Sequence, residues 1–253
     1  MSFKKIYLLM VLLLAVFCVG KADAQTLIDR ANEAYSNGDY VQAAELYEQS
    51  GEQDGTSAAY FYNLGNAYYK SGIYSRAILN YERSLLLDPG NEDARFNLTM
   101  AQAHISDKIE PLGTFFLQRW MTTVQNIFSS NAWAVIAVVA FLLFLVGLLL
   151  YIFVERVVWR KVGFFAGLLA LIVTVAANHF ASEQKAVLTH RDTAIIMAPT
   201  ITVKSSPSES GTELFVLHEG TKVYLTDRVG EWSEIRLEDG NQGWIPTDKL
   251  EVI

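Results

Sequence analysis

Apolar side chains along this chain gather in three long stretches. The first covers residues 6–19, and the others cover residues 132–154 and 162–180, where no Asp, Glu, Lys or Arg occurs. At a rise of 1.5 Å per residue, the second and third stretches form helices of about 34 and 28 Å, close to the roughly 30 Å of a bilayer's hydrocarbon core. The pattern therefore predicts two membrane-spanning helices that form a hairpin.

The first stretch has the pattern of a secretory signal peptide. Lys4 and Lys5 precede 14 apolar residues, and the small-x-small sequence Ala22-Asp23-Ala24 follows them. Such a stretch is short for a membrane span. We expect residues 1–24 to be cleaved off, with an uncleaved anchor as the alternative. Cys18, the sole cysteine, lies inside this segment, so the mature chain would have no thiol.

The predicted loop between the two spans, residues 155–161, carries Arg156, Arg160 and Lys161 against a single Glu155. Basic loops of this length stay in the cytoplasm. Both flanking regions are then expected on the opposite side of the membrane, where a signal peptide would also send the N-terminal region.

Three glycines interrupt the predicted spans, at Gly147, Gly163 and Gly167. Small residues let helix backbones approach closely in lipid. We expect them to pack the hairpin against itself, with dimerisation as the alternative. The spans carry none of the charged groups that ion paths and proton relays need, which disfavours a transporter or channel.

The exported N-terminal region repeats itself at an offset of 34 residues. Gly38, Tyr40, Ala43, Tyr47 and Ser50 each have a like residue 34 positions later. The positions that carry large, small and terminating residues in the second copy are Phe61, Leu64, Gly65, Tyr68, Ala77, Tyr81 and Pro89. This period and pattern resemble the tetratricopeptide repeat, a pair of packed helices that stacks into an all-α solenoid. We expect two repeats within residues 25–110, with residues 92–104 as a capping helix.

Tetratricopeptide arrays hold peptides in a groove that is lined by the first helix of each repeat, and the resemblance carries that expectation here. The candidate peptide-binding residues are Ile28, Asn32, Tyr35, Tyr62, Asn66, Tyr69 and Lys70. Asn32 and Asn66 lie one repeat apart, and an amide offers both donors and an acceptor to an extended backbone. The alternative is that both asparagines are only solvated.

Residues 111–131 show apolar residues at helical spacing between polar ones: Phe116, Trp120, Val124, Ile127 and Phe128. This pattern predicts an amphipathic juxtamembrane helix. It has two possible positions, on the membrane surface or under the repeat array as its final helix.

After a linker at residues 181–199, residues 200–253 alternate in short β-rich runs separated by Gly211, Gly220, Gly230 and Asp239-Gly240. Asp-Gly between alternating runs predicts a hairpin, and five short strands predict a small all-β barrel. The runs around Gly230-Glu231-Trp232 and Gly243-Trp244-Ile245-Pro246 resemble the bacterial SH3-like domain. Trp232, Trp244 and Pro246 are its candidate binding surface, with core filling as the alternative role of the two tryptophans.

Composition and charge narrow the class further. The chain has 253 residues, with 20 basic against 27 acidic side chains and a net charge of −7, which disfavours nucleic acid as a partner. Its four histidines fall in different segments, and it contains neither a phosphate-binding glycine loop nor a Gly-x-Ser-x-Gly motif. We therefore expect no catalytic residues, no metal site, no cofactor and no enzyme activity.

The order of these segments resembles the BatE-like family of the bacterial aerotolerance (Bat) operon. The stretches that carry the resemblance are residues 63–69, 108–111 and 217–223. The resemblance implies an inner-membrane protein that faces the periplasm, with von Willebrand factor A-type membrane proteins as partners and a role in oxygen or stress tolerance. We expect a protein-protein interaction scaffold that assembles a Bat-type complex, with an envelope sensor whose SH3-like domain binds peptidoglycan as the alternative.

Overall fold

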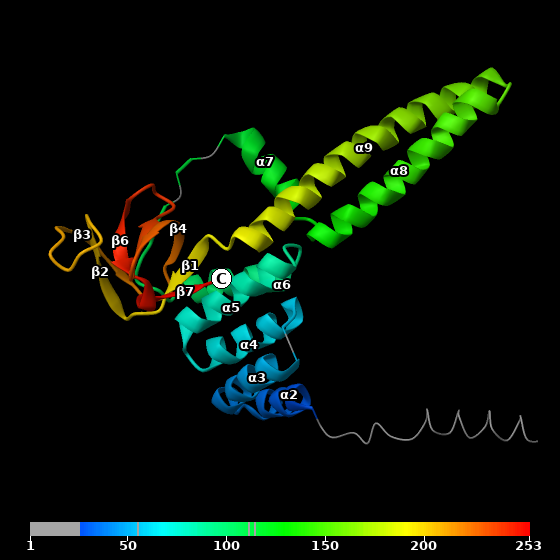
Figure 1. Cartoon of the computed structure of the whole chain (residues 1–253). Helices are drawn as coiled ribbons and strands as arrows, with labels where there is room; N and C mark the ends of the chain where they lie inside the picture. Colours follow the sequence, from blue (N-terminus) through cyan, green and yellow to red (C-terminus); the bar gives the residue numbers. More distant parts are fainter. Residues whose placement is uncertain (1–25, 55, 111, 114) are drawn as a thin grey trace, which may run out of the picture. The chain divides into compact units, whose positions relative to one another are not determined.

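The computed structural model describes residues 26–54, 56–110, 112–113 and 115–253 (Figure 1). The predicted signal peptide, including Cys18, lies outside the described residues. The chain divides into two compact units, one ending at Gly55 and one beginning at Thr56.

The first unit contains a helical hairpin of α2 (Leu27–Asn37) and α3 (Tyr40–Asp54). Thr26 caps α2, and its hydroxyl accepts a hydrogen bond from the backbone of Asp29. Gly38 ends the helix at φ +88°, a left-handed conformation that favours glycine. Ala31 and Ala43 are fully buried, so the two helices pack through small side chains.

The second unit begins with α4 (Ala58–Lys70), α5 (Tyr74–Leu87) and α6 (Glu92–Gln102). Gly65 allows α4 and α5 to approach closely, because a Cβ atom there would lie 2.8 Å from the ring of Tyr81. Asn91 caps α6 by accepting a hydrogen bond from the Ala94 amide. The pair α4 and α5 has the helix-turn-helix form expected for the second repeat, and α6 lies within residues 92–104, where the sequence predicts a further helix.

Three helices follow: α7 (Phe116–Gln125), α8 (Ser130–Phe153) and α9 (Val157–His190). Both α8 and α9 are long and apolar enough to cross a membrane. They pack against each other at the glycines, since a Cβ on Gly147 would lie 2.8 Å from both the Gly163 oxygen and the Gly167 Cα atom. The glycines therefore serve packing within the hairpin.

Two boundaries differ from the sequence-based expectation. The connection between α8 and α9 spans residues 154–156 rather than 155–161, because Arg160 is already helical and its side chain donates to the Tyr151 carbonyl at the end of α8. At the other end, α9 continues to His190 through half of the expected linker. Its polar residues there, including Glu183, Gln184 and Lys185, are good helix formers.

The C-terminal part is a seven-stranded antiparallel sheet with the strand order β3-β2-β6-β5-β4-β1-β7. The strands are β1 (Thr193–Ile196), β2 (Thr200–Lys204), β3 (Glu213–His218), β4 (Lys222–Val229), β5 (Trp232–Arg236), β6 (Gln242–Pro246) and β7 (Leu250–Val252), with a 3-10 turn at Thr247–Lys249. Asp239-Gly240 lies in the β5–β6 hairpin as expected, with Gly240 at φ +90°. The core comprises Ala194, Ile196, Val203, Leu217, Val223, Ile235, Leu237 and Ile245.

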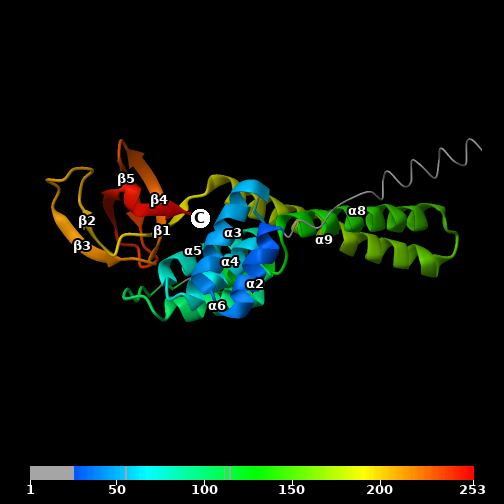
Figure 2. The ribbon, with the colours of Figure 1, turned by 90° about the horizontal axis from the view of Figure 1, so that it is seen from below.

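The strand β1 lies in the stretch expected to be a linker, and it runs between β4 and β7. Ala194, Ile195 and Ile196 are all fully buried, because one face of β1 joins the core of the sheet and the other faces α5. Both views in Figures 1 and 2 place this end of the sheet beside α5.

Candidate functional site

The candidate groove residue Asn66 lies on α4, where its side-chain oxygen is already used inside the unit. It accepts hydrogen bonds from the Tyr81 hydroxyl at 2.8 Å and from the Asn97 amide at 2.9 Å. These bonds tie α4 to α5 and α6. Asn66 therefore stabilises the stack of helices, and only its amide nitrogen remains to donate to a ligand.

Asn32 makes the corresponding internal hydrogen bond in the first unit. Its side-chain oxygen accepts a hydrogen bond from the Tyr47 hydroxyl at 2.5 Å, and this pair is separated by 15 residues, as are Asn66 and Tyr81. The two asparagines share a sequence register because each repeat uses the same internal bond. Ile28 and Tyr35 are half-buried on α2, and the Tyr35 ring packs edge-on against Tyr40 at 5.2 Å.

The other candidates on α4 differ in exposure. Tyr62 is half-buried 6.3 Å from the Tyr81 ring, and Tyr69 packs edge-on against Tyr74 at 5.7 Å. His104 stacks on Tyr74 at 4.1 Å and so extends this aromatic cluster. Lys70 is exposed at the end of the helix. Of the candidates on α4, Lys70 is thus the one whose side chain a partner can reach without disturbing the packing.

Trp232, Trp244 and Pro246 share the outer face of the β domain. The β5–β6 register pairs Trp232 with Pro246 and Glu234 with Trp244, while the alternating residues Ser233 and Ile245 are buried on the inner face. Neither tryptophan belongs to the core cluster, so their role is not core filling.

A surface cleft of about 740 Å³ opens on this outer face. Its lining consists of Glu209, Arg228, Glu231, Trp232, Pro246, Thr247, Asp248 and Lys249. An aromatic ring flanked by both cations and carboxylates can stack on a ring and pair with charged groups of a ligand. Of the three predicted residues, Trp232 and Pro246 thus line the cleft, and Trp244 does not.

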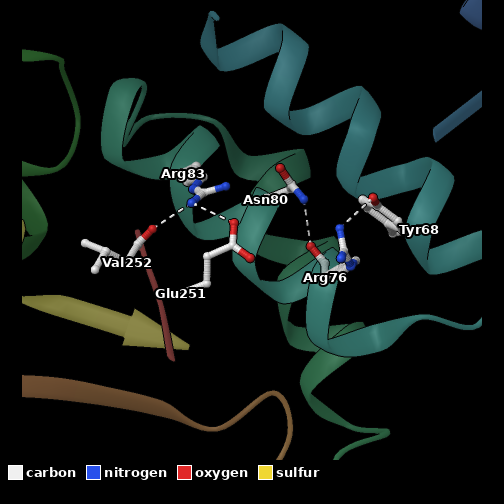
Figure 3. Close-up of polar contacts among 6 residues, drawn as sticks. All are labelled: Tyr68, Arg76, Asn80, Arg83, Glu251 and Val252. Atoms are coloured by element: carbon white, nitrogen blue, oxygen red, sulfur yellow. Dashed lines mark hydrogen bonds and ion pairs between the residues drawn. The ribbon is translucent and has the colours of Figure 1, made fainter. Parts of the chain in front are cut away.

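The structure also contains a feature that the sequence reasoning missed: the β domain is docked on α5. Glu251, Ile195 and Lys222 form a row across β7, β1 and β4. Lys222 pairs with Glu82 at 2.8 Å, and Arg83 pairs with Glu251 at 3.1 Å. Figure 3 shows Arg83 reaching both the Glu251 carboxylate and the Val252 carbonyl, the latter at 2.7 Å. Elsewhere on α5, Arg76 donates to Tyr68 and Asn80 to the Arg76 carbonyl.

The segment after α6 completes this docking. The Asp107 carboxylate accepts hydrogen bonds from the His218 amide and the Thr221 hydroxyl, both at 2.7 Å, and lies 2.8 Å from the His218 ring. Ile109 packs against the core of the sheet, and Leu112 donates to the Glu238 carbonyl. Two of the stretches that carry the family resemblance, residues 108–111 and 217–223, thus belong to segments that meet here. Pro111 itself lies outside the described residues.

Electrostatics at the docking contacts favour the charged forms. Burial alone would raise the pKa of Asp107, but the hydrogen bonds from His218 and Thr221 outweigh it and lower that pKa. Burial alone would lower the pKa of Lys222, but the neighbouring Glu82 carboxylate outweighs it and raises that pKa. Both groups are therefore held as ions in the contact.

Nothing in the described part of the chain forms a cluster of three or more His, Cys, Asp or Glu side chains that could hold a metal. The described residues form a helical repeat and a small β domain that are joined through one shared helix, α5.

Comparison with known families identifies both of these parts of the chain. A family model described as tetratricopeptide repeat matches residues 58–91, which cover α4, α5 and the turn before α6. A second, described as bacterial SH3 domain, matches residues 199–251. The chain thus carries a tetratricopeptide repeat and a bacterial SH3 domain, and neither is an enzymatic domain. A comparison with curated proteins finds no match.

Proposed function

We propose that this chain is a non-enzymatic, membrane-anchored scaffold for protein-protein interaction. The observation that carries the proposal is the helix α5, which closes the tetratricopeptide repeat on one side and holds the SH3 domain on the other through Lys222–Glu82 and Arg83–Glu251. Two recognition modules are thereby held in one block. Two weak contacts on one such block give strong combined binding when a partner can reach both.

In this proposal α8 and α9 span the inner membrane of a bacterium, and both ends of the mature chain face the periplasm. Arg156 in the short connection, and Arg160 and Lys161 in the first turns of α9, favour the cytoplasmic side for this end of the hairpin. The family resemblance supplies the partners: von Willebrand factor A-type membrane proteins of a Bat-type stress-tolerance complex.

Photocrosslinking in native membranes tests the scaffold. A benzoylphenylalanine in place of Lys70, which is exposed on the first helix of the second repeat, is expected to form an adduct with a membrane protein that mass spectrometry identifies. The control position is Val41, which is exposed on the second helix of the first repeat. Equal adducts at both positions, or none at Lys70, would contradict the scaffold. Asn66→Ala is unsuitable as a probe because it removes the acceptor of two internal bonds.

A second candidate function rests on the SH3 cleft. Trp232 flanked by Arg228 and Lys249 suits the sugar rings and carboxylates of peptidoglycan. Cosedimentation with purified cell-wall sacculi distinguishes the two functions. A peptidoglycan sensor would lose binding with Trp232→Ala and keep it with Trp244→Ala, which changes a tryptophan of the same face outside the cleft. The scaffold predicts no cosedimentation above background for the unmodified chain.

A further inference from the structure

The helix α7 exposes an apolar sector along its length. Phe116 and Trp120 are 70% and 62% exposed, and Leu117 and Met121 beside them are also exposed. The polar residues Gln118, Arg119, Thr122 and Thr123 occupy the opposite side of the helix. No residue of α7 is buried by the described part of the chain.

The polar side of α7 is the one that faces the repeat. A cleft of about 690 Å³ is lined on the α7 side by Gln118, Arg119, Thr122, Thr123, Asn126 and Ile127 and on the other side by Gly90, Glu92 and Arg95. Since the two sectors lie on opposite sides of one helix, the apolar sector points away from the repeat. The alternative in which α7 packs its apolar side under the repeat array therefore does not hold.

The C-terminal end of α7 is fastened to the hairpin. The Trp133 indole of α8 donates to the Gln125 carbonyl at 2.9 Å, and the Gln184 amide of α9 donates to the same carbonyl at 3.2 Å and to Asn126 at 3.0 Å. Val124 packs on the cluster around Trp133. Figure 1 shows α7 beside the end of the hairpin at which α8 begins.

We propose that α7 lies in the headgroup region of the bilayer that α8 and α9 span, with Phe116, Leu117 and Trp120 inserted among the acyl chains. This rests on the proposed membrane anchoring. Lipid is the occupant because the sector is fixed to the first turn of a spanning helix, where Trp133 marks the level favoured by interfacial aromatic rings. Arg119 is the only charged side chain of α7, so anionic lipid meets no repulsion.

Site-specific fluorescence quenching tests this placement in the full chain. Cys18 is replaced by Ser, and single cysteines at Trp120, Thr122 and Leu142 carry an environment-sensitive dye. The protein is reconstituted in vesicles of phosphatidylcholine and phosphatidylglycerol that contain nitroxide lipids. Leu142, exposed on α8, reports the bilayer core. Labels at positions 120 and 142 are expected to be quenched at least twofold more than the label at position 122, which faces the cleft.

Each other outcome overturns the placement in a recognisable way. Quenching at position 142 but not at position 120 rejects the interfacial helix and keeps the membrane anchor. Absence of quenching at both positions rejects the anchor and the interfacial helix together. A label at position 120 that is shielded from aqueous iodide yet not quenched by nitroxide lipid shows that protein covers the sector, from a partner or a second copy.

Discussion

Asn66 shows how a side chain chosen as a ligand contact can be occupied within the fold. Its spacing from Asn32 correctly reflects the repeat, but both side-chain oxygens accept bonds from tyrosines of the following helix. The sequence shows that the two asparagines occupy equivalent positions in the repeat. It does not show that a tyrosine hydroxyl 15 residues later donates to each of their side-chain oxygens. Peptide binding by these residues stays a prediction, and the exposed Lys70 is the better position to test it.

At Asp107, the carboxylate links the segment after α6 to the SH3 domain, and its lowered pKa has a consequence for stability. A carboxyl whose pKa is lower in the folded state stabilises the fold above its ordinary pKa of about 4, and this contribution is lost as the pH falls through the lowered value. We expect Asp107→Asn to reduce the free energy of unfolding by about 1–3 kcal/mol at neutral pH. The difference from the unmodified chain should shrink below about pH 4, as measured by thermal unfolding of the full chain in detergent.

The matched control is Asp248→Asn. Asp248 also pairs with a cation, Lys249, but its side chain is 67% exposed against 14% for Asp107. Exposed pairs contribute little, so this variant should unfold like the unmodified chain. An equal effect of the two substitutions would show that the Asp107 contact does not stabilise the docked domain.

The turn at Gly220 is where the SH3 domain closely approaches α5 and the segment after α6. A Cβ atom there would lie 2.6 Å from Ile105 and 3.2 Å from Ile78 of α5. Gly230 has a positive φ as well, but nothing lies within 4 Å of its Cβ position. Both alanine variants incur about 1 kcal/mol of backbone strain, while Gly220→Ala adds about 1–3 kcal/mol of steric overlap. Hydrogen exchange in residues 105–109 should rise for Gly220→Ala alone, and equal exchange in both variants would contradict the docking geometry.

The hairpin of α8 and α9 depends on its glycines in the same way. A Cβ on Gly163 would lie 2.7 Å from the Gly147 carbonyl oxygen. We expect Gly163→Leu to separate the helices and lower the thermal unfolding temperature in detergent, at a cost of about 1–3 kcal/mol. Leu142→Ala, which changes an exposed residue of α8, serves as the control. If Gly163→Leu unfolded at the unmodified temperature, close glycine packing would not hold the hairpin together.

Regular elements with a clear period could be predicted from the sequence: the repeat helices, α7 and the two apolar helices. The strand β1 could not, because Ala194, Ile195 and Ile196 are buried on both faces and so show no alternation. The docking on α5 was also missed. Lys222 and Glu82 lie 140 residues apart, and each alone resembles an ordinary surface charge.

At the scale of the whole molecule, topology is the most direct prediction. With Cys18 replaced by Ser, a cysteine at Ser210 in the SH3 domain should react with a membrane-impermeant maleimide in intact spheroplasts. A cysteine at Glu155, between α8 and α9, should react only after the membrane is permeabilised. Labelling of both positions in intact spheroplasts would contradict the proposed orientation.

The short passage from α9 into β1 limits how far the SH3 domain can move relative to α9. A flexible tether of 19 residues, the length of linker expected from the sequence, would let the domain move roughly 24 Å from α9. Here only Arg191 and Asp192 separate the helix from a strand that is hydrogen-bonded on both sides. The connection is therefore short and direct. A pull on the SH3 domain would reach α9 through two residues, and the β1–β4 and β1–β7 hydrogen-bond ladders would resist it.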